Sequence, residues 1–137
     1  MKKILFLVLV LVAGMTSFAQ DTKPITDKTK LLVYYFHITN RCHTCTTIEA
    51  TTRKVLLANF QEELNKGIIV FNTFNVDSTE NEAMCKKYDA YGATLALTKL
   101  KDGKEKIVDM SNFAFSKINN EKLFTEGLTQ KIKELIK

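Results

Sequence analysis

The chain has 137 residues, of which 45% are hydrophobic, and a formal net charge of +5. This length and composition allow one domain with a substantial core, and the mixing of 15 acidic with 20 basic residues excludes the basic stripe of a nucleic-acid-binding protein. Three cysteines, Cys42, Cys45 and Cys85, are too few for a scaffold held together by disulfides, and they leave one thiol over if two of them pair.

Residues 1–19 have the pattern of a signal peptide. Lys2 and Lys3 precede an apolar run at residues 4–12, and small residues stand before an expected cleavage site after Ala19. The run is shorter than the roughly 20 residues that a membrane-spanning helix needs. We therefore predict an exported protein, periplasmic or secreted, with no stable membrane span after cleavage. An uncleaved membrane anchor is the alternative.

Residues 20–29 are polar and contain the one proline of the chain, Pro24, so they are predicted to be a flexible leader. A single domain, residues 30–137, is expected to follow the leader, without internal repeats. Export would place this domain in a compartment where disulfides persist.

The domain is predicted to begin with a strand, a long helix and a second strand. Residues 31–38, LLVYYFHI, are apolar on both faces, as in a buried central strand, and Tyr34, Tyr35 and Phe36 are expected to be packing residues. From residue 42 to residue 66, apolar side chains recur at the three- and four-residue steps of an amphipathic helix. Because a helix joins the two strands, they must run parallel.

The second half of the domain is predicted to hold a short helix, a hairpin and a last helix. Asp102-Gly103 is a strong hairpin signal between two strands, and Asn119 and Asn120 can cap the last helix. The order β-α-β-α-β-β-α predicts a three-layer α/β sandwich on a mixed four-stranded sheet flanked by helices. The elements after the first helix are expected at residues 68–76, 82–88, 93–101 and 106–110, with the last helix following Asn119 and Asn120.

Cys42 and Cys45 stand where the first strand turns into the long helix. The unpaired N–H groups and the dipole of a helix start stabilise an anion, and Arg41 and protonated His43 would add positive charge. A thiolate is therefore favoured at Cys42, while Cys45, one turn deeper, can close a disulfide with it. Disulfide exchange, in which Cys42 attacks and Cys45 resolves the mixed disulfide, is the first hypothesis.

Two other interpretations of the cysteine pair stay open, namely a metal site and core packing. A structural zinc ion takes about four ligands, and the remaining candidates are His37, His43 and Cys85, with no second cysteine pair. Covalent haem attachment is excluded because Thr46, not histidine, follows Cys45.

The buried strand, the Cys-x-x-Cys pair at the start of a helix and the element order together resemble the thioredoxin-fold family. The resemblance covers about residues 30–137 and includes the family's second strand with the short helix after it, and its third strand with the hairpin. The residues that carry it are Phe74-Asn75-Val76-Asp77, Glu80-Asn81-Glu82, Lys87-Tyr88, Gly92-Ala93-Thr94-Leu95 and Lys101-Asp102-Gly103-Lys104-Glu105.

The resemblance implies that Cys42 is the nucleophile and Cys45 the resolving thiol of a redox-active disulfide that needs no bound cofactor. His43 and Thr44, between them, would tune the reduction potential toward an oxidising character. The resemblance also implies a shallow substrate groove around Gly92, Ala93 and Thr94.

The sequence departs from the family pattern at three places. Gly92-Ala93-Thr94 stands where members usually carry a cis-proline, which favours the metal alternative. Phe36 stands where reductases often place a buried aspartate, so a proton relay for Cys45 would fall to His37 or Glu49. Alternatively, His37 is a histidine hydrogen-bonded at the sheet face, and Glu49 is an ordinary solvated helix residue. Cys85 adds a third thiol, expected to be a buried apolar residue.

We therefore predict an exported thiol–disulfide oxidoreductase that acts on cysteines of other exported proteins. An unidentified redox partner would recycle it, and it is expected to be a monomer or weak dimer that binds no nucleic acid. The alternative is a metal-handling or redox-regulated binding module on the same fold, without catalytic turnover.

Overall fold

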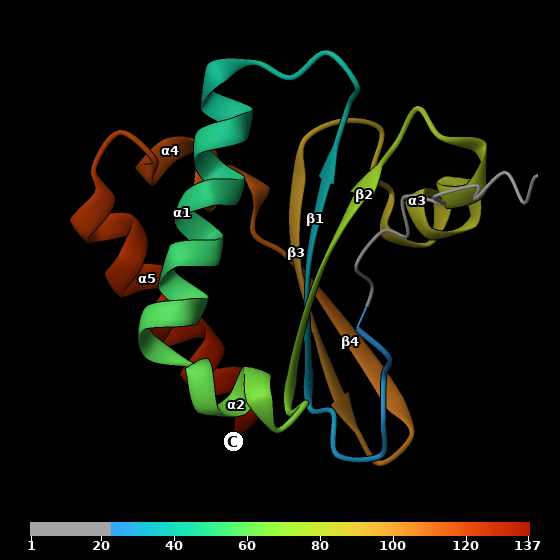
Figure 1. The fold of residues 1–137 in the computed structure, drawn as a ribbon, viewed down its shortest axis with the longest axis vertical. Helices are drawn as coiled ribbons and strands as arrows, with labels where there is room; N and C mark the ends of the chain where they lie inside the picture. Colours follow the sequence, from blue (N-terminus) through green and yellow to red (C-terminus); the bar gives the residue numbers. More distant parts are fainter. Residues whose placement is uncertain (1–22) are drawn as a thin grey trace, which may run out of the picture.

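Four strands form one mixed sheet in the order β2-β1-β3-β4 (Figure 1). The structure, a computed structural model, describes residues 23–137, so the predicted signal peptide lies outside the described residues. The first two strands pair in parallel, β3 runs antiparallel to β1, and β4 forms a hairpin with β3, which confirms the predicted mixed sheet. The strands are β1 (Leu31–His37), β2 (Ile69–Asn75), β3 (Thr94–Lys101) and β4 (Lys104–Asp109).

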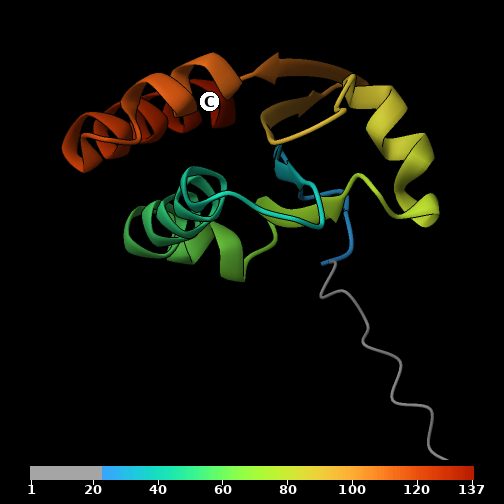
Figure 2. The same ribbon diagram turned by 90° about the horizontal axis from the view of Figure 1, so that it is seen from above.

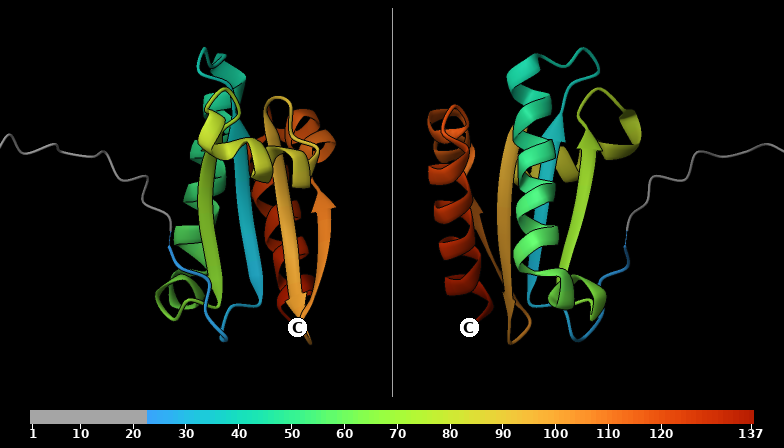
Figure 3. Two further views of the ribbon diagram at one scale, coloured as in Figure 1. Left: turned by 90° about the vertical axis from the view of Figure 1, so that its right-hand side faces the viewer. Right: turned by 60° about the vertical axis from the view of Figure 1, so that its left-hand side comes forward.

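Helices cover both faces of the sheet, as seen from above in Figure 2. One face carries α1 (His43–Asn59), α4 (Ser111–Lys117) and α5 (Glu121–Ile136), with the short α2 (Gln61–Asn65) after α1. The other face carries α3 (Glu82–Tyr88), which follows a 3₁₀ turn at Thr79–Asn81. Figure 3 shows α1 and α5 side by side along the same face. This is the predicted thioredoxin-like three-layer sandwich.

The central strand β1 is buried on both faces, which explains its unbroken apolar sequence. Successive side chains of a strand point to opposite faces. Val33 and Tyr35 therefore enter the core beneath α1, α4 and α5, whereas Tyr34 and Phe36 enter the core beneath α3. The sheet thus separates two hydrophobic clusters, one on each side of β1.

The predicted helix from residue 42 to residue 66 is two helices in the structure. Phe60 leaves the helical conformation with φ −139°, and α2 begins directly after it. The ring of Phe60 is 2% exposed and belongs to the core on the α1 side. Tertiary burial of this ring accompanies the break, which the apolar periodicity of the sequence does not signal.

Helix α4 was missed by the sequence analysis. It has seven residues, and Ala114 is its one fully buried side chain, so it lacks the apolar periodicity that marks a longer helix. Two hydrogen bonds hold its start instead. Locally, the carboxylate of Asp109 accepts from the N–H of Ser111 at 2.7 Å, and across to β3 the hydroxyl of Ser111 accepts from the N–H of Leu95 at 3.2 Å.

The end of β1, the start of α1 and the residues just before β3 lie together at one edge of the sheet. The chain passes from the last residues of β1 into α1, and Phe36 near that end pairs with Thr94, the first residue of β3. The start of α1 and the residues just before β3 therefore lie at the same edge.

The described part of the predicted leader is hydrogen-bonded to the domain at both of its ends. The hydroxyl of Thr29, which is 6% exposed, donates to the carbonyl oxygen of Gly67 at 2.9 Å. The N–H of Lys23 donates to the side-chain oxygen of Asn72 at 3.2 Å. Among the helices within residues 23–137, none combines the length and the apolar character needed to cross a membrane.

Candidate functional site

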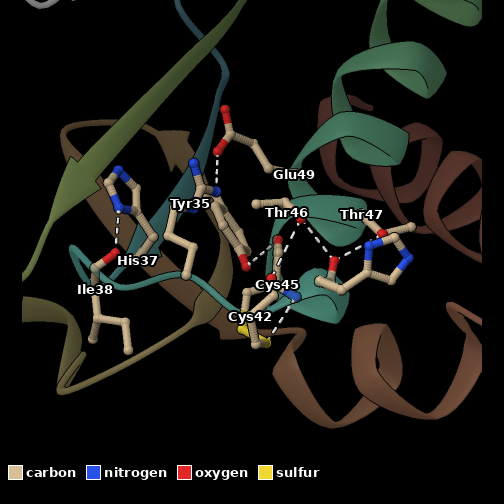
Figure 4. Close-up of a disulfide and its surroundings, with 10 residues drawn as sticks. Tyr35, His37, Ile38, Cys42, Cys45, Thr46, Thr47 and Glu49 are labelled. Atoms are coloured by element: carbon tan, nitrogen blue, oxygen red, sulfur yellow. Dashed lines mark hydrogen bonds and ion pairs between the residues drawn. A yellow bond between two sulfur atoms is a disulfide. The ribbon is translucent and has the colours of Figure 1, made fainter.

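A disulfide between Cys42 and Cys45 lies where β1 leads into α1 (Figure 4). The Cα atoms of the two residues are 5.2 Å apart. Cys42 is the N-cap of α1 in extended backbone conformation, and its Sγ accepts a hydrogen bond from the N–H of Cys45 at 3.1 Å. The sulfur therefore takes the place of a capping oxygen and satisfies one N–H that the first turn of a helix leaves unpaired.

The two sulfurs differ in exposure. Cys42 is exposed, whereas Cys45 is 8% exposed and faces the core. The outer cysteine is therefore accessible from solvent, while the inner one is shielded. This asymmetry suits an attacking and a resolving thiol, although the two roles themselves stay predictions.

The first turn of α1 favours negative charge at Cys42. It contains no acidic residue, and the hydroxyls of Thr46 and Thr47 donate to the carbonyl oxygen of His43 at 2.7 and 2.8 Å (Figure 4). The positive end of the helix dipole thus acts on the sulfur without an opposing carboxylate in that turn. His43 is exposed and Thr44 is partly buried, both between the two cysteines.

Tyr35 of β1 lies directly beneath the site, which the sequence analysis missed because it treated this residue as packing. Its ring is 1% exposed, and its hydroxyl donates to the carbonyl oxygen of Cys45 at 2.8 Å (Figure 4). Burial raises the pKa of Tyr35, so the hydroxyl stays protonated and remains a donor. The available signal was a tyrosine, not a phenylalanine, at an inward-facing position of a buried strand, since a buried hydroxyl needs a partner.

Arg41 and Glu49, both predicted to tune the thiols, form an ion pair with each other. The second carboxylate oxygen of Glu49 accepts from Arg53 at 3.1 Å. Burial acts to raise the pKa of Glu49, but the hydrogen bonds and charges of the two arginines outweigh it, and the pKa lies below its ordinary value. Glu49 is therefore ionised at neutral pH, and its charge compensates that of Arg41.

His37, the other proposed proton relay, ends β1, and its Nδ1 lies 3.1 Å from the carbonyl oxygen of Ile38. Figure 4 shows its ring directed away from the two sulfurs. The structure thus brings Arg41, Glu49 and the cysteines together and leaves His37 apart from them.

The predicted substrate groove, Gly92, Ala93 and Thr94, lies at the same edge of the sheet as the disulfide. The hydroxyl of Thr94 donates to the carbonyl oxygen of Gly92 at 3.3 Å, and the preceding Tyr91 is 78% exposed. All peptide bonds within residues 23–137 are trans. The role of this segment in binding a substrate remains a prediction.

Cys85 lies in α3, on the face of the sheet away from α1. It is 6% exposed and unpaired, and burial raises the pKa of its thiol. In the part of the chain that the structure describes, no three histidine, cysteine, aspartate or glutamate side chains are grouped to hold a metal ion.

The fold and the site together define a class of protein: a thioredoxin-like α/β sandwich with an accessible Cys-x-x-Cys disulfide at a helix start. Neither a protein-family model nor a curated protein matches the sequence. One similar solved structure is described as that of a malarial protein; it is 20% identical, with a TM-score of 0.42, and the alignment covers 68% of this chain and 98% of that chain.

Proposed function

We propose that the protein is an exported thiol–disulfide oxidoreductase whose redox-active group is the Cys42–Cys45 disulfide. The observation that carries this proposal is the pairing of an exposed Cys42 with a buried Cys45 at the first turn of α1. One sulfur is open to attack, and the other can re-form the bond only from within the protein.

Exchange with a dithiol client proceeds in two displacements. A client thiolate attacks the sulfur of Cys42, the bond to Cys45 breaks, and its electron pair stays on Cys45 as a thiolate that takes a proton from solvent. The second client thiolate then attacks the client sulfur of this mixed disulfide and expels the thiolate of Cys42. The client loses two electrons and two protons, the protein disulfide gains two electrons, and the reverse sequence reduces a client disulfide.

The start of α1 assists the second displacement, in which the Cys42 thiolate leaves, and the reverse reaction, in which it attacks. The N–H of Cys45 already donates to this sulfur, and the helix dipole stabilises the thiolate that leaves or attacks. Because a thiol with a lower pKa is a better leaving group, Cys42 is well suited to be expelled from the mixed disulfide when the client disulfide forms.

The clients would be cysteine-containing exported proteins, reached at the edge of the sheet where Gly92, Ala93 and Thr94 accompany the disulfide. The protein would act outside the cytoplasm, in the periplasm or after secretion, with residues 30–137 as its single domain. A separate redox partner would return the pair to its working state.

The test compares cysteine variants of residues 20–137 in a Cys85→Ser background. Oxidation and reduction of a peptide with two cysteines should be lost in Cys42→Ser, whereas Cys45→Ser should accumulate a mixed disulfide with the peptide, visible by mass. Equal turnover by Cys42→Ser and the parent would contradict the proposal. A parent that cycles in glutathione but never turns over a client would be a redox-regulated binding module instead.

A further inference from the structure

Three side chains connect the chain segments on either side of the disulfide. Arg41 precedes Cys42 in the loop, and its ion-pair partner Glu49 stands one turn after Cys45 on α1. The pair therefore spans the same segment that the disulfide closes, and Figure 4 shows Glu49 and Tyr35 on the same side of this segment.

Tyr35 supports this connection from the sheet. Its hydroxyl holds the carbonyl oxygen of Cys45 at 2.8 Å, and the guanidinium of Arg41 lies 5.7 Å from the centre of its ring. One buried ring thus contacts the backbone of the inner cysteine and the cation that precedes the outer one. We call Tyr35, Arg41 and Glu49 the brace.

The brace is shielded enough for its charges to matter. The side chains of Arg41 and Glu49 are 24% and 15% exposed, and ion pairs shielded from solvent are screened less than those on the open surface. Arg53, which also pairs with Glu49, is 53% exposed. The carboxylate of Glu49 thus offsets the charge of Arg41, the residue that precedes Cys42 in the chain.

We propose that Glu49 and Tyr35 are positioning residues that stabilise the disulfide relative to the dithiol, an inference that rests on the proposed function. After reduction, the brace keeps the loop and the first turn of α1 together, so the thiols stay at the separation that closes the bond. Glu49 also compensates the charge of Arg41, which would otherwise stabilise the Cys42 thiolate and hence the reduced form. Both effects make the centre less oxidising than its Cys-His-Thr-Cys motif alone indicates.

The two residues act differently, which makes the inference testable. Glu49→Gln removes a negative charge and weakens the brace, so it should make the reduction potential less negative and lower the pKa of Cys42. Tyr35→Phe removes one hydroxyl and no charge, so it should shift the potential in the same direction and leave the pKa of Cys42 nearly unchanged. We expect each variant to lower the oxidation equilibrium constant about threefold to tenfold, which corresponds to about 15 to 30 mV.

Matched controls remove similar groups away from the disulfide. Tyr88→Phe deletes another buried tyrosine hydroxyl, which bonds Thr98 at 2.7 Å on the α3 side of the sheet. Glu62→Gln deletes the ion pair with Lys66 on α2. Neither control should move the potential.

The experiment equilibrates residues 20–137, in a Cys85→Ser background, with graded mixtures of reduced and oxidised glutathione and counts free thiols by the mass added on alkylation. The pKa of Cys42 follows from the pH dependence of alkylation of the reduced protein. Shifted potentials in both brace variants, a lowered pKa in Glu49→Gln alone and unmoved controls are the expected result.

Variants that unfold more easily but keep the potential of the parent would overturn the proposal, because the brace would then be structural only. A parent with a clear redox equilibrium and no client turnover would refute the proposed function but not the proposed effect of Glu49 and Tyr35 on the reduction potential. A parent that never equilibrates with glutathione would refute both.

Discussion

The two cysteine regions of this molecule carry the same side chain in opposite settings. Cys42 caps α1 at the surface, where its sulfur accepts an N–H and meets the positive end of the helix dipole. Cys85 lies within α3, buried in the smaller hydrophobic cluster, and burial raises its pKa. Position relative to a helix start, and not residue type, is therefore expected to make Cys42 the more reactive of the two thiols.

Two buried tyrosines, one on each face of the sheet, show a similar contrast. Tyr35 donates to the backbone of the site on the α1 side, whereas Tyr88 bonds Thr98 inside the opposite cluster. Both hydroxyls are buried and paired, but that of Tyr35 contacts the segment that carries the disulfide. The following predictions test these two contrasts and the packing around them.

The largest expected difference is in thiol reactivity. In the reduced protein at neutral pH, Cys42 should react with iodoacetamide about 100-fold or more faster than Cys85, because it is exposed and its thiolate is stabilised while the other thiol is buried with a raised pKa. Peptide mapping by mass spectrometry over time measures both rates. Comparable rates would remove the contrast between the two regions.

Packing on the α1 side should be intolerant at Gly127 of α5. A Cβ there would lie 2.5 Å from Cε2 of Phe113, whose ring centre lies 5.6 Å from that of Phe124. Gly127→Ala should destabilise the protein by about 1 to 3 kcal/mol, beyond the helix propensity that alanine gains, as measured by urea unfolding. Gly92→Ala, where a Cβ meets nothing within 4 Å, is the control and should be nearly neutral.

The tyrosine on the α3 side should matter for stability alone. Tyr88→Phe leaves the fully buried hydroxyl of Thr98 without its partner, so we expect a loss of about 1 to 2 kcal/mol in the free energy of unfolding. The reduction potential should stay that of the parent. A shifted potential would show that the two faces are coupled.

The ion pairs of Glu49 should make the stability of the oxidised protein sensitive to acid. Its folded pKa is below the ordinary value of 4.5, so its contribution is present above that value and is lost as the pH falls through the folded pKa. The urea concentration at the unfolding midpoint should therefore decrease when the pH is lowered below about 4.5. This decrease should be less steep in Glu49→Gln. Parallel curves for parent and variant would contradict this role.

The smallest effect is expected at Thr52 of α1. Its side chain is 0% exposed, and its hydroxyl has no hydrogen-bond partner. Thr52→Val should stabilise the protein by about 0.5 to 1 kcal/mol, because it removes an unpaired buried polar group and keeps the β-branched shape. Thr98→Val is the matched control and should lose stability, since that hydroxyl is paired.

Local patterns predicted the parts of the fold that depend on neighbours in sequence. The turn at Asp102-Gly103 is one, with φ values of 51° and 71° that glycine and aspartate tolerate better than most residues. The cap at Asn120 is another, because its side chain accepts from the N–H of Leu123 at 3.1 Å. Phe60 escaped prediction because its burial against other elements accompanies the helix break, and α4 because its start depends partly on a hydrogen bond to β3.

The site shows the same division. The sequence by itself determined the order of the elements, the parallel pair, the place of Cys42 and Cys45 at a helix start and the possibility of their disulfide, since these follow from periodicity, spacing and helix-end chemistry. Only the tertiary structure decided that Glu49 compensates Arg41 and that Tyr35 holds Cys45. Those contacts join β1, the loop and α1, and distances across elements are set by how the helix packs on the sheet.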